Sequence, residues 1–571
     1  MSQQFTRRII LRSLAGLGVG TIAFQRALAQ SASNAAEITP EMIAQAQWIA
    51  QSELSTEEQA EVAKAVGDVL KQQAALRAVT IDADTSPAFA FVPHHFIEML
   101  DLVPEPAKRP RVQWRPSNEA LPRVTSVDEM AYWSIAQQAR ALRSGKTTSA
   151  ELTRMYLARL RKYDPLLRCV ICLTEELALE QADKADKELA NGIDRGPLHG
   201  IPWGAKDLIA VPPYKTTWGG APFKEQIRPN LATVAQRLFD AGAVLIAKLS
   251  LGTMAWGDVW HDATTRNPWN PEQGSSGSSA GSSSAVAAGL CSFAIGSETL
   301  GSIVSPCRRC RTTGLRPSFG RVSRFGCMAL AWSMDKIGPI ARNAEDCALV
   351  FAAIHGRDGK DPTVIDRDFA WPIRFDPKAI KIGVVDGQIR ESDQIVIDLL
   401  RDAGASIQSI TYSTAIPEDA LVSALGVEAS TMFDDLVNQN VEDKEIGMWG
   451  PTFRESQWVR AIHYIRGMRA RTNLITETEQ TLRQVDFVVG SEDLVRTNLS
   501  GHPSMVVSFG SESRDNGTQL PRVTKLTSRF CGESMLLAAG DFIQRRLPVT
   551  VQPTLDKFLE QGTEPAKVDG D

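Results

Sequence analysis

The chain has 571 residues, 43% of them hydrophobic and 23% charged, and its formal net charge is −5 at pH 7. This composition is that of an ordinary globular protein and argues against a disordered or membrane-spanning chain. The mild negative charge and the lack of a basic stripe argue against nucleic acid as a partner. Eight cysteines are too few for a disulfide-rich scaffold.

Residues 1–30 have the features of a twin-arginine signal peptide, in the right order. Arg7 and Arg8 are followed by an apolar, glycine-containing stretch at 13–24 and by an A-x-A cleavage site at 27–29. The apolar stretch is shorter than the about 20 residues that a membrane span needs. We therefore expect export by the twin-arginine route, to the periplasm or out of the cell, without stable membrane insertion. A basic N-terminus without a targeting role and an uncleaved anchor are the alternatives.

Residues 31–124 are predicted to form a helical N-terminal extension. Thr39 before a proline, and Ser55 three residues before Glu58, are signals for helix starts. Five prolines between 104 and 122 indicate an extended connector. We expect this extension to pack on the main body or to shape an entrance to it.

From residue 125 onward, helices alternate with short apolar strands. Thr148 and Glu151 form a capping box before one helix, and 177–189 is amphipathic at helical spacing. An apolar run at 243–248 is typical of a buried strand. This alternation predicts an α/β fold with a large mixed sheet and helices on both faces. The segment 410–480 is more helical and is expected to form a cap over a pocket.

Two C-x-x-C pairs are present, Cys169/Cys172 and Cys307/Cys310. A zinc or redox site would use such pairs, but the seven histidines are scattered and the first pair lies in an apolar, strand-like run. We interpret these cysteines as core residues and expect neither a metal nor a cofactor.

A glycine- and serine-rich run at 274–284 resembles a flexible linker in composition. It follows a segment with turn chemistry at 267–271 and continues into small residues at 285–289. Small residues in such a place allow close approach of the backbone and expose amide donors. The run therefore predicts a site rather than a linker.

Two serines 24 positions apart, Ser278 and Ser302, follow a lysine in the segment 196–207, Gly-Pro-Leu-His-Gly-Ile-Pro-Trp-Gly-Ala-Lys-Asp. With this spacing the chain resembles the amidase signature family. The resemblance runs, with interruptions, from Ser126 to about Gln544, and we expect an amidase signature domain over 125–571. It implies the amidase signature fold and hydrolysis of amide C–N bonds by a Ser–Ser–Lys triad, without metal or cofactor. Ser302 would be the nucleophile, Ser278 the relay and Lys206 the base. Among the neighbouring serines only Ser278 has both the spacing and the two small residues that follow the paired serines of the family, whose members have a cis peptide bond before this position.

The resemblance also implies that the backbone N–H groups of Thr299, Leu300 and Gly301 form the oxyanion hole, and that the Met254 carbonyl contacts the substrate. The common family pattern has glycine at 300 and arginine at 304, where this chain has leucine and Val304. We read these differences as marks of a subgroup, because the three triad residues are present. Five tryptophans are expected to line or support the acyl pocket and to favour a bulky apolar substrate: Trp203, Trp218, Trp256, Trp260 and Trp332.

Serine is a weak nucleophile and needs a base, and lysine serves as a base only when it is neutral, a state that burial favours. From these residues we expect an exported amidase that acts on a small-molecule amide, as a monomer or homodimer. A carbamate or ester hydrolase with the same triad, the glutamine-hydrolysing subunit of a tRNA amidotransferase, and a non-catalytic binding protein are the alternatives.

Overall fold

The structure is a computed structural model that describes residues 38–50, 53–80, 121–438, 441–514 and 517–561. The predicted signal peptide at 1–30 lies outside the described residues, as does most of the proline-containing connector. What the structure describes of the N-terminal extension is two helices, α3 (Pro40–Ala46) and α4 (Thr56–Ala78), with a short 3-10 helix between them, Gln47–Ala50.

The centre of the described chain is an eleven-stranded sheet in the order β1-β3-β2-β8-β10-β9-β14-β15-β13-β11-β12. The pairs β3–β2, β2–β8, β13–β11 and β11–β12 are parallel, and the remaining pairs are antiparallel. The expected mixed sheet is therefore confirmed. Its strands are β1 Val170–Leu173, β2 Pro202–Lys206, β3 Val244–Leu249, β8 Phe293–Glu298, β9 Thr313–Arg316, β10 Lys336–Ala341, β11 Lys381–Val384, β12 Ser406–Ser409, β13 Phe487–Val489, β14 Ser504–Ser513 and β15 Gln519–Thr527. Two small sheets pair β4 (Val259–Trp260) with β5 (Ala263–Thr264) and β6 (Arg266–Asn267) with β7 (Asn270–Gly274).

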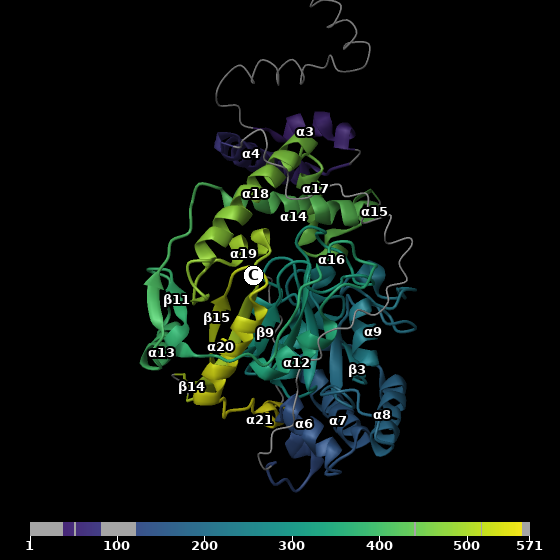
Figure 1. Cartoon of the computed structure of the whole chain (residues 1–571). Coiled ribbons are helices and arrows are strands. Elements are labelled where there is room, and N and C mark those ends of the chain that lie inside the picture. Colours follow the sequence, from purple (N-terminus) through teal and green to yellow (C-terminus); the bar gives the residue numbers. More distant parts are fainter. Residues whose placement is uncertain (1–37, 51–52, 81–120, 439–440, 515–516, 562–571) are drawn as a thin grey trace, which may run out of the picture.

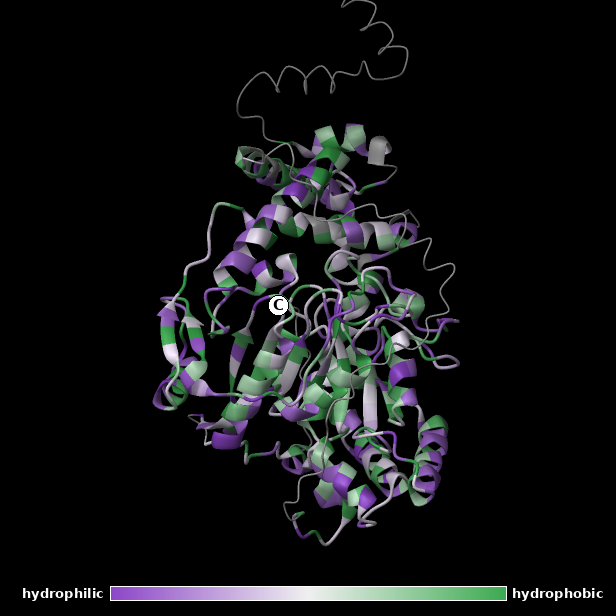
Figure 2. Cartoon of the chain, viewed as in Figure 1, coloured by the Kyte–Doolittle hydropathy of each residue, from purple (hydrophilic) through white to green (hydrophobic). Residues whose placement is uncertain are grey.

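Helices cover both faces of this sheet, as the sequence predicts. On one face, a side chain at Gly314 of β9 would meet Cys307 of α11 (Val304–Cys310), which packs beside α10 (Ala280–Ala287). On the other face, Met505 and Val507 of β14 meet α20 (Glu533–Arg546), which packs against α12 (Ala344–Ile354). Figure 1 shows α12 and α20 in front of the strands. In Figure 2 the hydrophobic residues gather on these inner elements, whereas outer helices such as α8 are largely hydrophilic.

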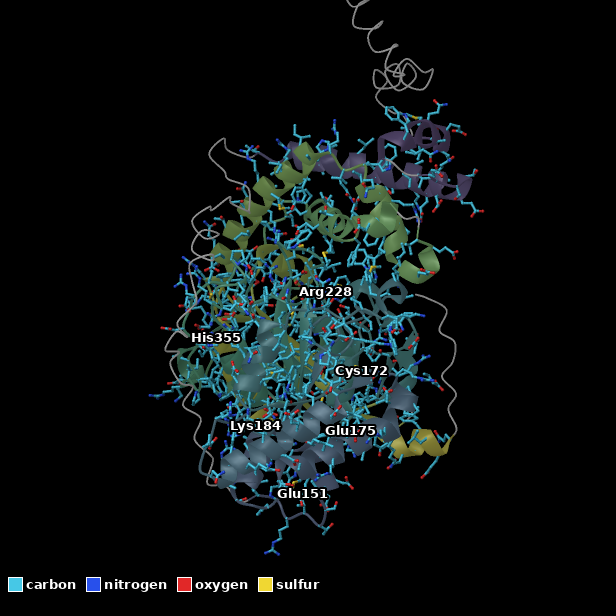
Figure 3. All side chains as sticks on the ribbon, turned by 90° about the vertical axis from the view of Figure 1, so that its right-hand side faces the viewer. Glu151, Cys172, Glu175, Lys184, Arg228 and His355 are labelled. Atoms are coloured by element: carbon cyan, nitrogen blue, oxygen red, sulfur yellow. The ribbon has the colours of Figure 1, made fainter. Side chains whose placement is uncertain are left out.

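The remaining helices follow the alternation read from the sequence. The capping box expected before the helix at 149 is present, because the Thr148 hydroxyl accepts from the Glu151 N–H and the Glu151 carboxylate accepts from the Thr148 N–H. Figure 3 shows Glu151 at this helix end and Glu175 with Lys184 on the next helix. These helices are α6 Ile135–Arg143, α7 Ser149–Leu167, α8 Glu175–Ala190, α9 Thr233–Asp240, α13 Glu391–Asp402 and α21 Leu555–Glu560, with 3-10 helices at Val127–Tyr132, Ala221–Phe223, Thr253–Ala255 and Pro377–Ala379.

Most of the described part of 410–480 consists of helices, as expected, and together with α19 these helices form a layer above the sheet (Figure 1). The N-terminal helix α4 packs on this layer, where Arg454 contacts Glu58 at 3.3 Å and Glu61 at 2.8 Å. The expected packing of the extension on the main body is therefore present. The helices of the layer are α14 Glu418–Met432, α15 Asp434–Asn438, α16 Asp443–Ile446, α17 Trp449–Ser456, α18 Ala461–Leu482 and α19 Leu494–Ser500.

Candidate active site

Lys206 is the last residue of β2, a strand that runs between β3 and β8 and is buried along its whole length. Its amine therefore ends inside the protein, among hydroxyl groups. Lys206 Nζ lies 2.8 Å from Ser278 Oγ, 2.9 Å from Ser297 Oγ and 3.1 Å from Ser279 Oγ. The structure thus brings the predicted base to the predicted relay, and it adds Ser279 and Ser297 as further partners.

Within the described ranges, the partners of the Lys206 amine are serine hydroxyls and a backbone carbonyl, and no carboxylate contacts it. Burial lowers the pKa of Lys206 to about 7, although Asp335 and Glu298 oppose this shift from a distance. The neighbouring Asp207 does not pair with Lys206, because successive side chains of an extended chain point in opposite directions. Asp207 instead forms a fully buried ion pair with Lys248, at 2.6 Å. The amine of Lys206 can therefore be neutral near pH 7, as a general base must be.

Ser278 follows a cis peptide bond from Gly277, which is the bond that the family resemblance implies. Glycine is required at 277, because a Cβ there would lie 1.8 Å from the carbonyl oxygen of Gly257. The next residue, Ser279, donates its backbone N–H to the carbonyl of Ser302 at 3.0 Å. This hydrogen bond joins the loop of the relay serine to the loop of the predicted nucleophile.

Ser302 lies between β8 and α11, at the floor of a cleft, and is 8% exposed. In the part of the chain that the structure describes, no hydrogen bond joins its hydroxyl to Ser278. Catalytic hydrogen bonds are often long in proteins without substrate and shorten when substrate binds. The two hydroxyls lie on loops that are already tied together, so the geometry is compatible with the predicted relay.

The loop 299–301 is the predicted oxyanion hole. Gly301 has a φ of +87°, a conformation that favours glycine, whereas Leu300 is not among the described residues with positive φ. The leucine at 300 is therefore accommodated without strain. Over the described residues, the N–H groups of Thr299, Leu300 and Gly301 have no acceptor within the protein, so they can bind a developing negative charge.

Glu298 holds this loop in place, a role that the sequence did not reveal. One carboxylate oxygen accepts from the N–H groups of Ile303 and Val304, at 2.8 and 2.9 Å, and the other contacts Arg316 at 2.8 Å. Burial alone would raise the pKa of Glu298, but Arg316 and the nearby Lys336 lower it to about 2. Glu298 is thus a charged anchor on the turn that carries Ser302. The sequence signal that could have indicated this role is the position of Glu298, four residues before Ser302.

The catalytic cleft has a volume of about 760 Å³. Ser302, Thr299 and Leu300 lie on its lining, together with apolar and polar residues. The apolar residues include Trp256, Leu330, Val422, Leu425 and Trp449, and the polar ones include Asp258, Glu272, Gln273, Ser276 and Arg309. A neighbouring cavity of about 510 Å³ shares Trp256, Val422, Leu425 and Trp449 with the cleft and is also lined by α4, so the N-terminal extension borders the approach to the site.

Met254 is not on the lining of this cleft. Its side chain is fully buried, and its carbonyl accepts a hydrogen bond from the Trp449 indole at 3.2 Å. A direct contact of that carbonyl with substrate remains a prediction. In the present structure the carbonyl is hydrogen-bonded to the Trp449 indole. The tryptophan itself, which the sequence did not single out, lies between Met254 and the cleft.

Of the five tryptophans predicted to line or support the pocket, only Trp256 lines the catalytic cleft within the described residues. Trp203 stacks on Phe293 in the core of the sheet, with ring centroids 6.1 Å apart. Trp218 packs on aromatic rings, Trp260 donates to a backbone carbonyl, and Trp332 lines a different cavity. Lining of this cleft was wrongly expected for Trp203 and Trp332, because composition does not reveal which cavity or core a ring meets.

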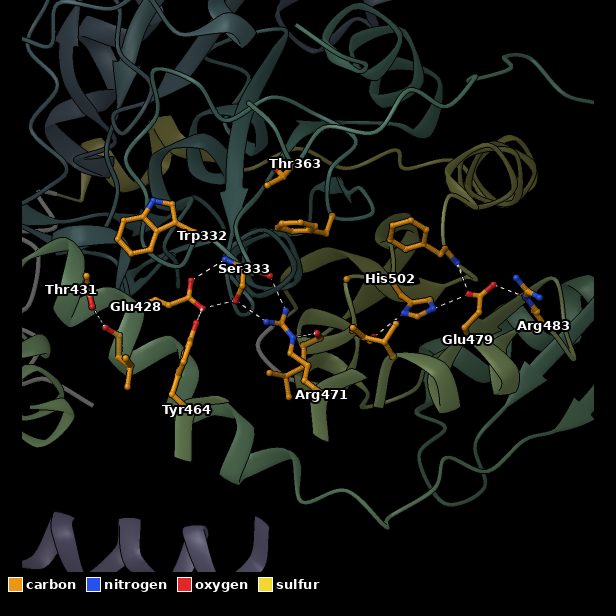
Figure 4. A pocket seen from close by; sticks show the side chains of 17 residues that line it. Trp332, Ser333, Thr363, Glu428, Thr431, Tyr464, Arg471, Glu479, Arg483 and His502 are labelled. Atoms are coloured by element: carbon orange, nitrogen blue, oxygen red, sulfur yellow. Dashed lines mark hydrogen bonds and ion pairs between the residues drawn. The ribbon is translucent and has the colours of Figure 1, made fainter. Parts of the chain in front are cut away.

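The cavity beside Trp332, shown in Figure 4, has a volume of about 880 Å³ and shares no lining residue with the catalytic cleft. Its polar side chains bind one another. Glu428 accepts hydrogen bonds from Ser333 and Tyr464, and Arg471 donates to Ser333. His502 contacts Glu479. These polar side chains therefore find hydrogen-bond partners among themselves.

All eight cysteines are unpaired in the structure. Cys169, Cys307 and Cys310 are fully buried, and burial raises the pKa of each thiol, to about 11 for Cys307. Among the described residues no group of three or more His, Cys, Asp or Glu side chains has a metal-binding arrangement.

Both the sequence and the fold match known proteins. The profile of the amidase family matches residues 151–491. A glutamyl-tRNA(Gln) amidotransferase subunit of Roseiflexus sp. (strain RS-1) is 33% identical over 473 residues, covering 72% of this chain and 96% of the relative. The corresponding protein of Pseudomonas aeruginosa is 30% identical over 467 residues, covering 75% and 94%. The solved peptide amidase from Stenotrophomonas maltophilia superposes with a TM-score of 0.67 at 28% identity, covering 75% of this chain and 100% of that one. No helix among the described residues is long and apolar enough to span a membrane.

Proposed function

The chain belongs to the amidase signature family of hydrolases, and from this premise we propose that it cleaves carboxylic amides through an acyl-enzyme on Ser302. The observation that carries the proposal is the buried amine of Lys206, which lies 2.8 Å from Ser278 Oγ. A backbone hydrogen bond joins the loop of Ser278 to the loop that bears Ser302. A base with a pKa of about 7 is half neutral at physiological pH.

The proposed reaction needs only proton transfers and one covalent intermediate. Ser302 Oγ attacks the carbonyl carbon while its proton passes to Ser278 and the proton of Ser278 passes to neutral Lys206. The N–H groups of Thr299, Leu300 and Gly301 stabilise the oxyanion. The C–N bond then breaks as Lys206 returns the proton through Ser278 to the leaving nitrogen. Water adds to the acyl-enzyme by the same route and releases the acid.

The apolar part of the cleft supports a substrate with a bulky apolar or aromatic group. The rings of Trp256 and Trp449 meet edge-on, with centroids 4.6 Å apart. Trp256→Ala is expected to lower kcat/KM for amides with an aromatic group by roughly tenfold or more, and to change acetamide turnover little. The matched control is Trp332→Ala, which removes a similarly exposed tryptophan from the separate cavity. Equal losses in both variants, or for both amides, would contradict this assignment of the aromatic group.

The proposal is tested by measuring product release from a primary aryl amide, an anilide, a peptide amide, an N-aryl carbamate and an ester, with purified protein lacking residues 1–30. If the native protein cleaves amides and the Ser302→Ala variant does not, the result supports an amidase. Preference for the carbamate or ester would select the related hydrolase with the same triad. Binding without turnover of any of them would favour a non-catalytic protein.

A second candidate is the hydrolysis of glutamine as part of a tRNA amidotransferase, because the curated relatives that match most of the chain carry that name. L-glutamine therefore belongs in the same panel. Selective release of ammonia from glutamine, together with co-purification of other subunits, would replace the first proposal by this one.

We also propose that the protein acts outside the cytoplasm, supported by the twin-arginine pattern at Arg7 and Arg8. Changing both arginines to lysine is expected to retain the full-length chain in the cytoplasm, whereas the native sequence yields a chain about 30 residues shorter in the periplasmic or secreted fraction. Immunodetection in cell fractions measures this. Identical distribution of the two forms would contradict export by this route.

A further inference from the structure

A second, basic cavity of about 850 Å³ borders the catalytic cleft. The two share five lining residues, which therefore border both the basic cavity and the cleft that contains Ser302. The shared residues are Glu272, Gln273, Ser276, Ser305 and Arg309. Ser305 and Arg309 are four positions apart on α11 and therefore lie on the same side of that helix.

Positive charge dominates this cavity. Its lining includes four arginines and one lysine against a single acid, Glu272. The basic residues come from three separate parts of the chain, which are helix α11 with the residue after it, the end of strand β14, and helix α21. They are Arg308, Arg309, Arg311, Arg514 and Lys557.

Carboxylates neutralise this charge only in part. Arg311 contacts Glu512 at 3.1 Å, and Arg308 contacts Glu492 at 3.5 Å. For Arg309, the described residues offer one hydrogen-bond acceptor, the backbone carbonyl of Gly274 at 3.3 Å, and its charge also acts on the nearby carboxylate of Asp258.

Arg514 and Lys557 likewise have no acidic partner within 4.0 Å in the part of the chain that the structure describes. Burial lowers the pKa of Arg311; Glu512 opposes that shift, and the nearby charge of Arg514 reinforces it. Like charges gathered in a partly enclosed space repel one another, and a bound anion relieves that repulsion.

The chemistry of these side chains selects a carboxylate well. Guanidinium groups donate two parallel hydrogen bonds to a carboxylate, and such charge-assisted bonds are stronger than neutral ones. From Val304 to Arg309 the axis of α11 advances about 8 Å. An anion on Arg309 would thus lie several bonds away from a carbonyl carbon held at Ser302, with the apolar residues around Trp256 in another part of the same cleft.

We propose that the substrate is an amide that carries a carboxylate, held in this basic cavity by Arg309 and Arg514, while its apolar part contacts Trp256 and Trp449. This inference rests on the proposed amidase function and narrows its substrate class. Arg309 and Arg514 are specificity residues in this proposal, and the bond broken is the amide C–N bond already assigned to Ser302.

The test compares amides with a terminal carboxylate and the same compounds with a primary alcohol in its place. One arm places the carboxylate on the acyl side, as in the monoamide of a dicarboxylic acid; the other places it on the amine side, as in an N-acyl amino acid. Native protein is expected to favour the carboxylate in one arm by about ten- to hundredfold in kcat/KM, mainly through KM. Arg309→Gln and Arg514→Gln should bring that ratio towards one, and Arg309→Lys should retain part of it.

Arg374→Gln is the matched control, since this arginine is 89% exposed and lies outside both cavities. It should leave the ratio unchanged. A native ratio near one in both arms, or an equal loss for charged and neutral substrates in Arg309→Gln, would overturn the proposal.

A binding measurement separates this result from the fate of the amidase function. Calorimetry with Ser302→Ala compares the affinity of the carboxylate and alcohol compounds without any turnover. If neutral amides are cleaved but the carboxylate compounds have no advantage in rate or affinity, the proposed anion site is wrong and the proposed amidase function is supported. If nothing is cleaved but the carboxylate binds more tightly in an Arg309-dependent way, the anion site stands and the amidase function fails.

Discussion

Ser302→Ala is expected to remove amide hydrolysis, by a factor on the order of 10⁴ to 10⁶ in kcat. The hydroxyl is the only group on the cleft floor that follows the family spacing and lies on the loop that carries the free amide donors of residues 299–301. Without it no acyl-enzyme forms, and the remaining donors stabilise only direct attack by water. Rates of amine release under saturating substrate measure the loss.

The substitution should leave folding intact, because the Ser302 hydroxyl makes no hydrogen bond within the described protein and the backbone bond from Ser279 remains. Thermal unfolding and substrate-analogue affinity should therefore match the native protein. Ser409→Ala, on the edge strand β12 with its hydroxyl on Asp386, is a control that should retain full activity. Activity in Ser302→Ala above about one hundredth of the native rate would exclude Ser302 as the nucleophile, given the usual loss.

Lys206→Ala is expected to lower kcat/KM by about 10²- to 10⁴-fold at neutral pH, the usual contribution of a general base. The native profile should rise with pH through a pKa of about 7 and then level off, since only the neutral amine accepts a proton. Below that pKa the rate should fall tenfold per pH unit. The variant lacks this base, so its residual rate should rise with hydroxide concentration, and its deficit should be larger at neutral than at high pH.

Lys206→Arg distinguishes a base from a structural cation. Arginine can still donate to the hydroxyls of Ser278 and Ser297, but its pKa is so high that it stays protonated and cannot accept the proton. It should be as inactive as the alanine variant at neutral pH while unfolding at a temperature closer to the native one. Full activity of Lys206→Arg, or a residual rate of Lys206→Ala that does not change with pH, would count against Lys206 as the base.

Features carried by local sequence were predictable. The capping boxes at Ser55 and at Thr148 depend on residues three apart, and both form. The apolar run at 243–248 becomes β3, and the small residues after Ser279 become α10. The spacing of Ser278 and Ser302 likewise identified two loops that the structure joins through a backbone hydrogen bond.

Other features depend on which distant segments the fold brings together. The pairing of Asp207 with Lys248, which leaves Lys206 without a carboxylate, needs β2 and β3 side by side. The anchoring of Glu298 by Arg316 needs the arrangement of β8, β10 and β9. Neither follows from spacing along the chain.

By itself, then, the sequence determined the family, the alternation of helices and strands and the residues proposed for the triad, because motifs, caps and periodicity are properties of neighbouring residues. The three-dimensional fold was needed to place Trp449 on the lining of the cleft, to place Trp203 in the core, and to bring arginines from α11 and from the residue after β14 into one cavity beside Ser302. Cavities and the pKa of a buried amine arise from surfaces that meet across long stretches of chain, and no local pattern records which surfaces meet.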